Sequence, residues 1–209
     1  SYINTIHSIM LCGAGSTATS CANPVILGSD TSGTTFDLSS ISAGASAGSL
    51  GNLGVATPGS TFAYMQVIMS KTFTIKGTGL NAASATCYTA DNADGGTATI
   101  SAIQAKGSTN SAKYASQAIK VANNATLDTN MRGTDNIDGT TSGDAANGNS
   151  GVDKTYLAFI AELTAPFTMK AGSIPQMKIA FDLSEATNFP SNDCTVSPAS
   201  PTVTVTFLN

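Results

Sequence analysis

The chain contains no tryptophan and a single histidine, and only 11% of its 209 residues are charged. Without tryptophan, a platform that stacks on sugar rings would depend on tyrosine or phenylalanine. His7 stands beside no nucleophile signature such as G-x-S-x-G, so a Ser-His-Asp triad has little support. Glu162 and Glu185 are the only glutamates, and a paired-carboxylate hydrolase would have to use loop aspartates. The sequence therefore predicts that the protein is not an enzyme.

The low content of charged residues also argues against some classes of binding partner. The net charge is -4 and the nine lysines and arginines are spread singly, whereas nucleic-acid binding favours a basic stripe. No apolar run reaches the roughly 18 residues of a membrane span. With 41% hydrophobic residues and little net charge, the composition is that of a folded chain and not of a disordered one. We expect a surface of hydroxyls and amides, which can pack closely against copies of itself.

Four cysteines are present, and four allow three connectivities. Cys12 and Cys21 enclose the small-residue loop GAGSTATS, so we expect Cys12–Cys21 and Cys87–Cys194 disulfides. The alternatives are free buried cysteines in a cytosolic protein and a zinc site, which is disfavoured because no two cysteines lie two to four residues apart. A chain that begins at Ser1 without Met is typical of a mature secreted protein whose signal peptide has been removed, although a trimmed chain would begin in the same way. We therefore expect an extracellular or cell-surface protein.

Alternating β-branched and aromatic residues, separated by Gly, Pro and Asn turns, predict strands along most of the chain. Residues 61–69 carry large side chains at both parities, which indicates a strand buried on both faces, and residues 72–76 alternate more cleanly. Further strands are expected at 25–27, 34–38, 97–105, 154–163, 177–183 and 202–208, while 114–121 fits a short helix or a strand. The predicted fold is all-β: residues 12–209 form a single antiparallel β-sandwich, jelly-roll or Ig-like, with long loops and an extended N-terminal strand.

Residues 1–11, SYINTIHSIML, form that N-terminal strand, because they are rich in Ile and Thr and free of Gly and Pro. An apolar terminal segment must pair in its own sheet or in that of a neighbour. We therefore expect residues 1–11 to be a candidate donor strand for polymerisation. Its anchoring residues are Ile3, Ile6, Ile9 and Leu11. The C-terminal strand at 202–208 is the alternative donor, although a Cys87–Cys194 bond would anchor it to its own subunit.

Residues 128–153 contain almost no large apolar side chain and are predicted to form a long exposed loop. The loop includes DNIDG, and the pattern D-N-x-D-G also occurs as DNADG earlier in the chain. The candidate calcium ligands are Asp91, Asp94, Asp135 and Asp138. The EF-hand spacing is absent, however, and Asx-rich turns are the competing interpretation. Asn124 begins an N-glycosylation sequon, Asn-Ala-Thr.

The run TPGST … SKTFTIKGTG, within residues 53–79, resembles the PG-turn and F-x-I-x-x-x-G strand pattern of TasA/camelysin-type secreted matrix-fibre proteins. Those proteins are jelly-roll β-sandwich subunits that polymerise by lending an N-terminal strand to the next subunit. The chain departs from that pattern in its long insertion before TFTIK and in its four cysteines. Chaperone–usher pilins, which bear disulfides and are rich in Thr, Gly and Ala, are similar in composition and in strand donation. Both resemblances imply a self-assembling secreted fibre subunit, of the kind found in pili and biofilms.

The leading hypothesis is a structural subunit of an extracellular filament or pilus. Its partner is a copy of itself, and head-to-tail donor-strand complementation produces an open polymer. The alternative is a secreted adhesin or carbohydrate-binding β-sandwich module that binds glycans through the 128–153 loop, with calcium as a candidate ligand. A hydrolase built on Asp135 and Asp138 ranks third. No other cofactor is expected.

Overall fold

The computed structural model describes residues 1–39, 51–91, 105–121, 130–138, 154–172, 176–184, 187–198 and 202–208. In chain order, its strands are β1 (Tyr2–Cys12), β2 (Val25–Asp37), β3 (Thr61–Ser70), β4 (Thr72–Ile75), β5 (Thr78–Leu80), β6 (Thr86–Tyr88), β7 (Ala105–Lys106), β8 (Gln117–Lys120), β9 (Met131–Thr134), β10 (Tyr156–Thr168), β11 (Gln176–Asp182), β12 (Thr187–Asn188), β13 (Thr195–Pro198) and β14 (Thr202–Leu208). Two 3-10 turns, η1 (Leu53–Val55) and η2 (Ser111–Lys113), complete the described elements. All the strand pairs are antiparallel, which confirms the predicted all-β antiparallel fold.

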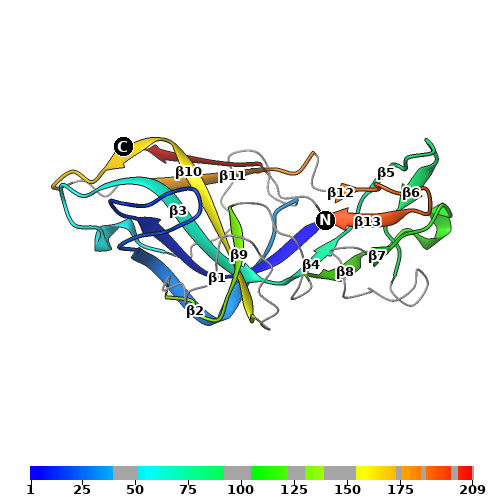
Figure 1. Cartoon of the computed structure of the whole chain (residues 1–209), viewed down its shortest axis with the longest axis horizontal. Helices are drawn as coiled ribbons and strands as arrows, with labels where there is room; N and C mark the ends of the chain where they lie inside the picture. Colours follow the sequence, from blue (N-terminus) through cyan, green and yellow to red (C-terminus); the bar gives the residue numbers. More distant parts are fainter. Residues whose placement is uncertain are drawn as a thin grey trace.

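The molecule is elongated, with a large sheet at one end and the short strands β5, β6, β7, β12 and β13 at the other (Figure 1). The large sheet has the strand order β8-β4-β1-β3-β10-β9, and β2 pairs with β1. β1 thus lies inside the sheet. β2 pairs with one of its edges; along the other edge, β4 pairs with Tyr2 and Ile3, and β3 pairs with the residues from Ile6 to Cys12. Within the described residues, no helix has the length and the apolar character needed to cross a bilayer.

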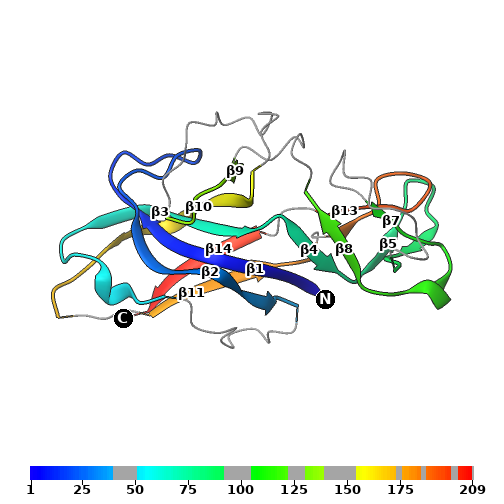
Figure 2. The ribbon, with the colours of Figure 1, turned by 90° about the horizontal axis from the view of Figure 1, so that it is seen from below.

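β11 and β14 form a second, two-stranded sheet that lies as a separate layer over the large sheet (Figures 1 and 2). The space between the two layers is filled by apolar side chains, which we call the sandwich core. Its fully or nearly fully buried members include Leu11, Phe62, Met65, Val67 and Val205. Burying a side chain of this size contributes about 1.5–3 kcal/mol relative to leaving it in water. The core therefore holds the two layers together as a β-sandwich.

β3 is buried on both faces, as its two apolar parities predicted. Met65 and Val67 lie in the sandwich core, whereas Ile68 packs on the opposite face of the sheet, and none of the three is more than 4% exposed. The parity rule placed Phe62 with Ile68, and this was wrong, because Phe62 lies in the sandwich core. The pairing of β3 with β10 shifts register between Tyr64 and Phe62, which breaks the alternation.

The far end of the molecule is built around a disulfide. Cys87 and Cys194 are 0% and 1% exposed, and they pack with Ile75, Ile119 and Val196 in a second apolar cluster. The structure contains both disulfides expected from the sequence: the Cα atoms are 5.0 Å apart in Cys12–Cys21 and 5.5 Å apart in Cys87–Cys194. No free cysteine remains, so the thiol and zinc alternatives do not apply.

Some expected elements differ from the observed ones. Residues 25–27 and all but the last residue of 34–38 belong to one long strand, β2, and the ambiguous segment 114–121 contains the strand β8. The strand expected at 97–105 lies outside the described residues except for its last residue, which begins β7. The remaining short strands, β5, β6, β12 and β13, have two to four residues each and were not predicted, because so short a run shows no periodicity.

Candidate assembly site

β1 is the first strand of the chain and yet occupies a slot between β2 and the β3–β4 pair (Figure 2). Of the four residues predicted to anchor a donated strand, Ile6, Ile9 and Leu11 are 9%, 9% and 0% exposed and belong to the sandwich core. Ile3 is half-buried. The structure therefore places three of the four anchors in the core of their own subunit.

His7 marks a break in the regular pairing of this slot. The register of β1 shifts between Ile6 and Ser8 against both β2 and β3, which is why Ile6 and Ile9 reach the same core in spite of their opposite parities. The His7 ring is 8% exposed, with Nδ1 3.3 Å from the Asp30 carbonyl oxygen and its centroid 4.6 Å from that of Tyr156. His7 thus contacts a carbonyl and an aromatic ring, neither of which is a nucleophile.

The start of β1 is held by polar contacts with the opposite strand. The Ser1 ammonium group donates to the Lys76 carbonyl at 3.0 Å, and the Lys76 N–H returns a bond to the Ser1 carbonyl at 2.8 Å. The Asn4 amide donates to the carbonyls of Ser70 and Thr72 at 3.1 and 3.0 Å. The acceptors of the Ser1 and Asn4 bonds are backbone carbonyls, so these contacts do not depend on the side chains of Ser70, Thr72 or Lys76.

The hairpin that follows β1 is closed by the Cys12–Cys21 disulfide and fixed to the sheet by Arg132 of β9. The Arg132 guanidinium donates to the Thr19 carbonyl from Nη1 and to Gln66 Oε1 from Nη2, the latter at 2.8 Å. Arg132 is only 7% exposed, and burial lowers the pKa of its guanidinium. The loop expected at 128–153 is therefore wrong for residues 131–134, which form a strand with a buried arginine. Nothing in the sequence distinguishes this arginine from a solvated one.

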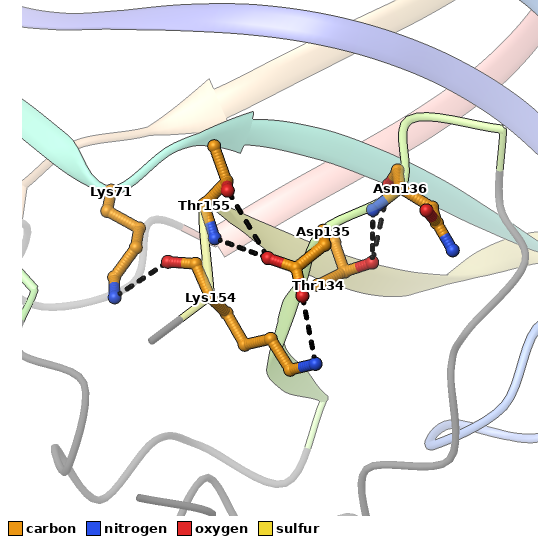
Figure 3. A network of polar contacts seen from close by, with 6 residues as sticks. All are labelled: Lys71, Thr134, Asp135, Asn136, Lys154 and Thr155. Atoms are coloured by element: carbon orange, nitrogen blue, oxygen red, sulfur yellow. Dashed lines mark hydrogen bonds and ion pairs between the residues drawn. The ribbon is translucent and has the colours of Figure 1, made fainter. Parts of the chain in front are cut away.

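The candidate calcium residue Asp135 takes part in a polar network that includes Lys154 and Thr155 (Figure 3). Its Oδ2 accepts from Lys154 Nζ at 3.0 Å, and its Oδ1 accepts from the Thr155 N–H and hydroxyl at 3.0 and 3.2 Å. The bond from Lys154 is the main reason that the pKa of Asp135 is lowered. Lys71, which is 5% exposed, donates to the Lys154 carbonyl at 3.1 Å. Together these bonds form a clamp that joins residue 135 to residues 154 and 155, at the two ends of the segment between them.

The candidate calcium ligands do not form a cluster of three or more in the part of the chain that the structure describes. No group of three or more His, Cys, Asp or Glu residues in that part is arranged to hold a metal ion. Asp94 and the sequon residue Asn124 lie outside the described residues, while Asp91 and Asp138 lie within them. A cation at Asp135 would have to displace the Lys154 ammonium group from its carboxylate.

Among the described residues, Tyr114 is an exposed aromatic side chain on which a sugar ring could stack. It is 39% exposed and makes an edge contact with Tyr88, with ring centroids 5.7 Å apart. The ammonium group of Lys76 lies over the Tyr114 ring, 4.7 Å from its centroid. Because this cation–π contact occupies one face of the ring, at most the other face is open for stacking.

No protein-family model, curated protein or solved structure matches the chain. The class of protein is therefore defined by its fold and its disulfides alone. The chain is an antiparallel β-sandwich with two disulfides, and its first strand is built into the middle of the larger sheet. Two disulfides are compatible with an extracellular location.

Proposed function

We propose that the chain is a structural subunit of an extracellular filament, and that copies join head-to-tail by exchanging the N-terminal strand. The observation that carries this proposal is the position of β1, the first described strand, which is paired along both edges. Withdrawing β1 would open a groove between β2 and β3 and uncover the sandwich core. Because every copy contains the same β1, that of a neighbour fits this groove with the same contacts.

The closed monomer and the exchanged polymer contain the same β1 contacts, so the choice between them depends on when the groove is filled. Once β1 is in place, leaving the slot exposes Ile6, Ile9 and Leu11 to water, at a cost of several kcal/mol. Exchange is therefore expected during folding, while the groove is still open and neighbouring chains are concentrated. A surface poor in charge favours this step, since copies approach one another with little repulsion.

The Cys12–Cys21 disulfide sets the C-terminal limit of the donated segment. Cys12 stays within 5.0 Å of Cys21 of its own subunit, measured between Cα atoms, so the hinge lies directly before it. The part of β1 that precedes Cys12, residues 2–11, spans roughly 33 Å when extended. A non-reciprocal exchange of this segment gives an open filament, whereas a reciprocal exchange gives a closed dimer. The alternative donor, β14, is joined by only seven residues to Cys194, which the second disulfide holds in its own subunit.

A cysteine pair across β1 and β2 tests the exchange in the full-length chain. Thr5 and Thr35 are directly opposite each other, with hydroxyl oxygens 2.9 Å apart on the exposed face. In the double variant Thr5→Cys/Thr35→Cys, refolded and oxidised at high concentration, a closed monomer gives an intrachain disulfide. The exchanged polymer gives an interchain disulfide, which appears as a ladder of covalent multimers on a non-reducing gel.

The expected result is this ladder, together with filaments in electron micrographs of the same sample. The single variant Thr5→Cys is the control for random cross-linking, and it should give at most dimers. Filaments that contain only monomer bands would refute exchange of β1 and leave another contact as the assembly interface. A monodisperse monomer without filaments, with a Tm raised by calcium or a glycan, would refute the proposed function and support the adhesin instead.

A further inference from the structure

The described strands that end a sheet differ in how well their outer edges are protected. β2 is interrupted by the irregularity opposite His7, and its Leu27 carbonyl accepts a bond from the Asn52 N–H. β9 has only four residues. In β14, the Val205 carbonyl accepts from the Thr164 hydroxyl at 3.4 Å. Such interruptions, short lengths and covers are the usual ways in which a sheet avoids pairing at its edges.

Among the described residues, none interrupts or covers β11 in this way, and β11 is seven residues long. It pairs with β14 through seven consecutive residues without a register shift, and it contains no Gly or Pro. In the described part of the chain, β11 has no strand partner other than β14. Met177, Ile179 and Phe181 are half-buried and alternate with exposed residues, and the first two pack against the sandwich core. A two-stranded sheet is only marginally stable by itself, so pairing with a further strand would stabilise this layer.

We propose that β11 pairs in antiparallel fashion with β11 of a second copy, about a two-fold axis through Ala180. This register places Lys178 of each copy opposite Asp182 of the other on the exposed face. On the core-facing side, the same register places Ile179 of each copy opposite Phe181 of the other. Directly opposite residues on paired strands interact when the charges are opposite or the side chains are apolar, and β11 supplies both kinds twice.

The charge pattern favours a second copy over other occupants. The two charged residues of β11 are exposed, have opposite signs and lie four positions apart, so the strand is complementary to itself when it is reversed. A foreign strand would have to carry the same pattern to avoid an unpaired or repelled charge at this edge. The pairing joins the two-stranded layers into one four-stranded sheet and closes on two copies, because a two-fold interface uses the same surface twice. It does not depend on β1 exchange, and in a filament it would connect neighbouring strands of polymer laterally.

Charge exchange tests the pairing in chains whose β1 is locked in its own subunit. For this purpose the Thr5→Cys/Thr35→Cys variant is refolded and oxidised at high dilution, and the monomer with the intrachain disulfide is isolated, so that the two interfaces are separated. For locked chains with the native β11 sequence, analytical ultracentrifugation at increasing protein concentration should reveal dimers. Lys178→Asp places like charges opposite each other twice, and so does Asp182→Lys. Each change should weaken dimerisation by about tenfold or more. An equimolar mixture of the two variants should restore dimers, because every opposed pair is then complementary, and so should the double variant.

The recovery in the mixture and in the double variant is the result that a general loss of stability would not produce. The Tm values of the single variants provide the folding control. Both residues are exposed, and Asp182→Lys removes an exposed hydrogen bond from the Ser184 N–H, so the Tm should change little. The proposal is overturned if the single variants dimerise as well as the parent, if the double variant fails to recover, or if the locked parent stays monomeric at millimolar concentration. None of these outcomes bears on the ladder produced by β1 exchange, so the two proposals fail separately.

Discussion

Removal of the Cys87–Cys194 disulfide is expected to destabilise the protein about twice as much as removal of Cys12–Cys21. The cysteines are 107 positions apart in the first bond and 9 apart in the second. With these separations, the entropy of closing the loop in the unfolded chain corresponds to about 4.8 and about 2.6 kcal/mol at 25 °C. All four cysteines are at most 7% exposed, so replacement by alanine opens a small cavity in both cases, and the difference of about 2 kcal/mol reflects mainly loop length.

The measurement compares Cys87→Ala/Cys194→Ala with Cys12→Ala/Cys21→Ala by urea and by thermal denaturation at low protein concentration, where association is weak. For a chain of this length, each kcal/mol lowers Tm by about 2–4 °C, so the first variant should lose about 10–20 °C and the second about 5–10 °C. Equal losses, or the reverse order, would refute the reasoning. They would mean that residual structure keeps the ends of the long loop close together in the unfolded chain.

Three further changes have defined outcomes. Gly33→Ala should lower the free energy of unfolding by more than Gly59→Ala. Both glycines have positive φ, but a Cβ at Gly33 would lie 2.4 Å from Thr5 Cγ2, whereas a Cβ at Gly59 would meet no atom within 4 Å. Equal losses of stability on urea denaturation would contradict this. Arg132→Met should cost about 1–3 kcal/mol by urea denaturation and speed proteolysis within the Cys12–Cys21 hairpin, because it leaves buried acceptors unpaired; an unchanged midpoint would contradict this. Hydrogen bonds, first that from the Ser191 hydroxyl, lower the pKa of Asp193 to about 2, so its contribution to stability is complete above about pH 4 and is lost as the pH falls towards 2. Asp193→Asn should therefore reduce the loss of stability over that pH range, as measured by urea midpoints, and an unaltered pH profile would contradict this.

The sequence predicted those parts of the fold that repeat over several residues. β14 covers the residues expected for the last strand, and β11 lies within one residue of its predicted range, because alternation over seven positions is a strong signal. β10 is buried at consecutive positions, and it ends five residues beyond its predicted range of 154–163. The disulfide pairing followed from the small loop between Cys12 and Cys21, which leaves a single partner for each remaining cysteine.

The features that depend on distant partners could not be predicted. Arg132 is buried because Gln66 and the Thr19 carbonyl accept its bonds, and these partners are 66 and 113 positions away in the chain. Ile6 reaches the sandwich core only because β1 shifts register beside its neighbours, which alternation within β1 does not reveal. The sequence identifies Asp135 as a candidate metal ligand in a turn. That its carboxylate binds the Lys154 ammonium group depends on the position of Lys154, which local sequence does not reveal.

The clamp between Asp135 and residues 154 and 155 also bears on how the protein can be engineered. Both ends of the intervening segment are tied by hydrogen bonds to each other, and Lys71 ties Lys154 to the end of β3. Asp135 and Lys154 are therefore held next to each other by contacts that do not involve the residues between them. Each doubling of that connection adds only about 0.6 kcal/mol of closure entropy. A foreign peptide grafted between the anchors would thus be presented at a defined position on every copy, at little cost to the fold.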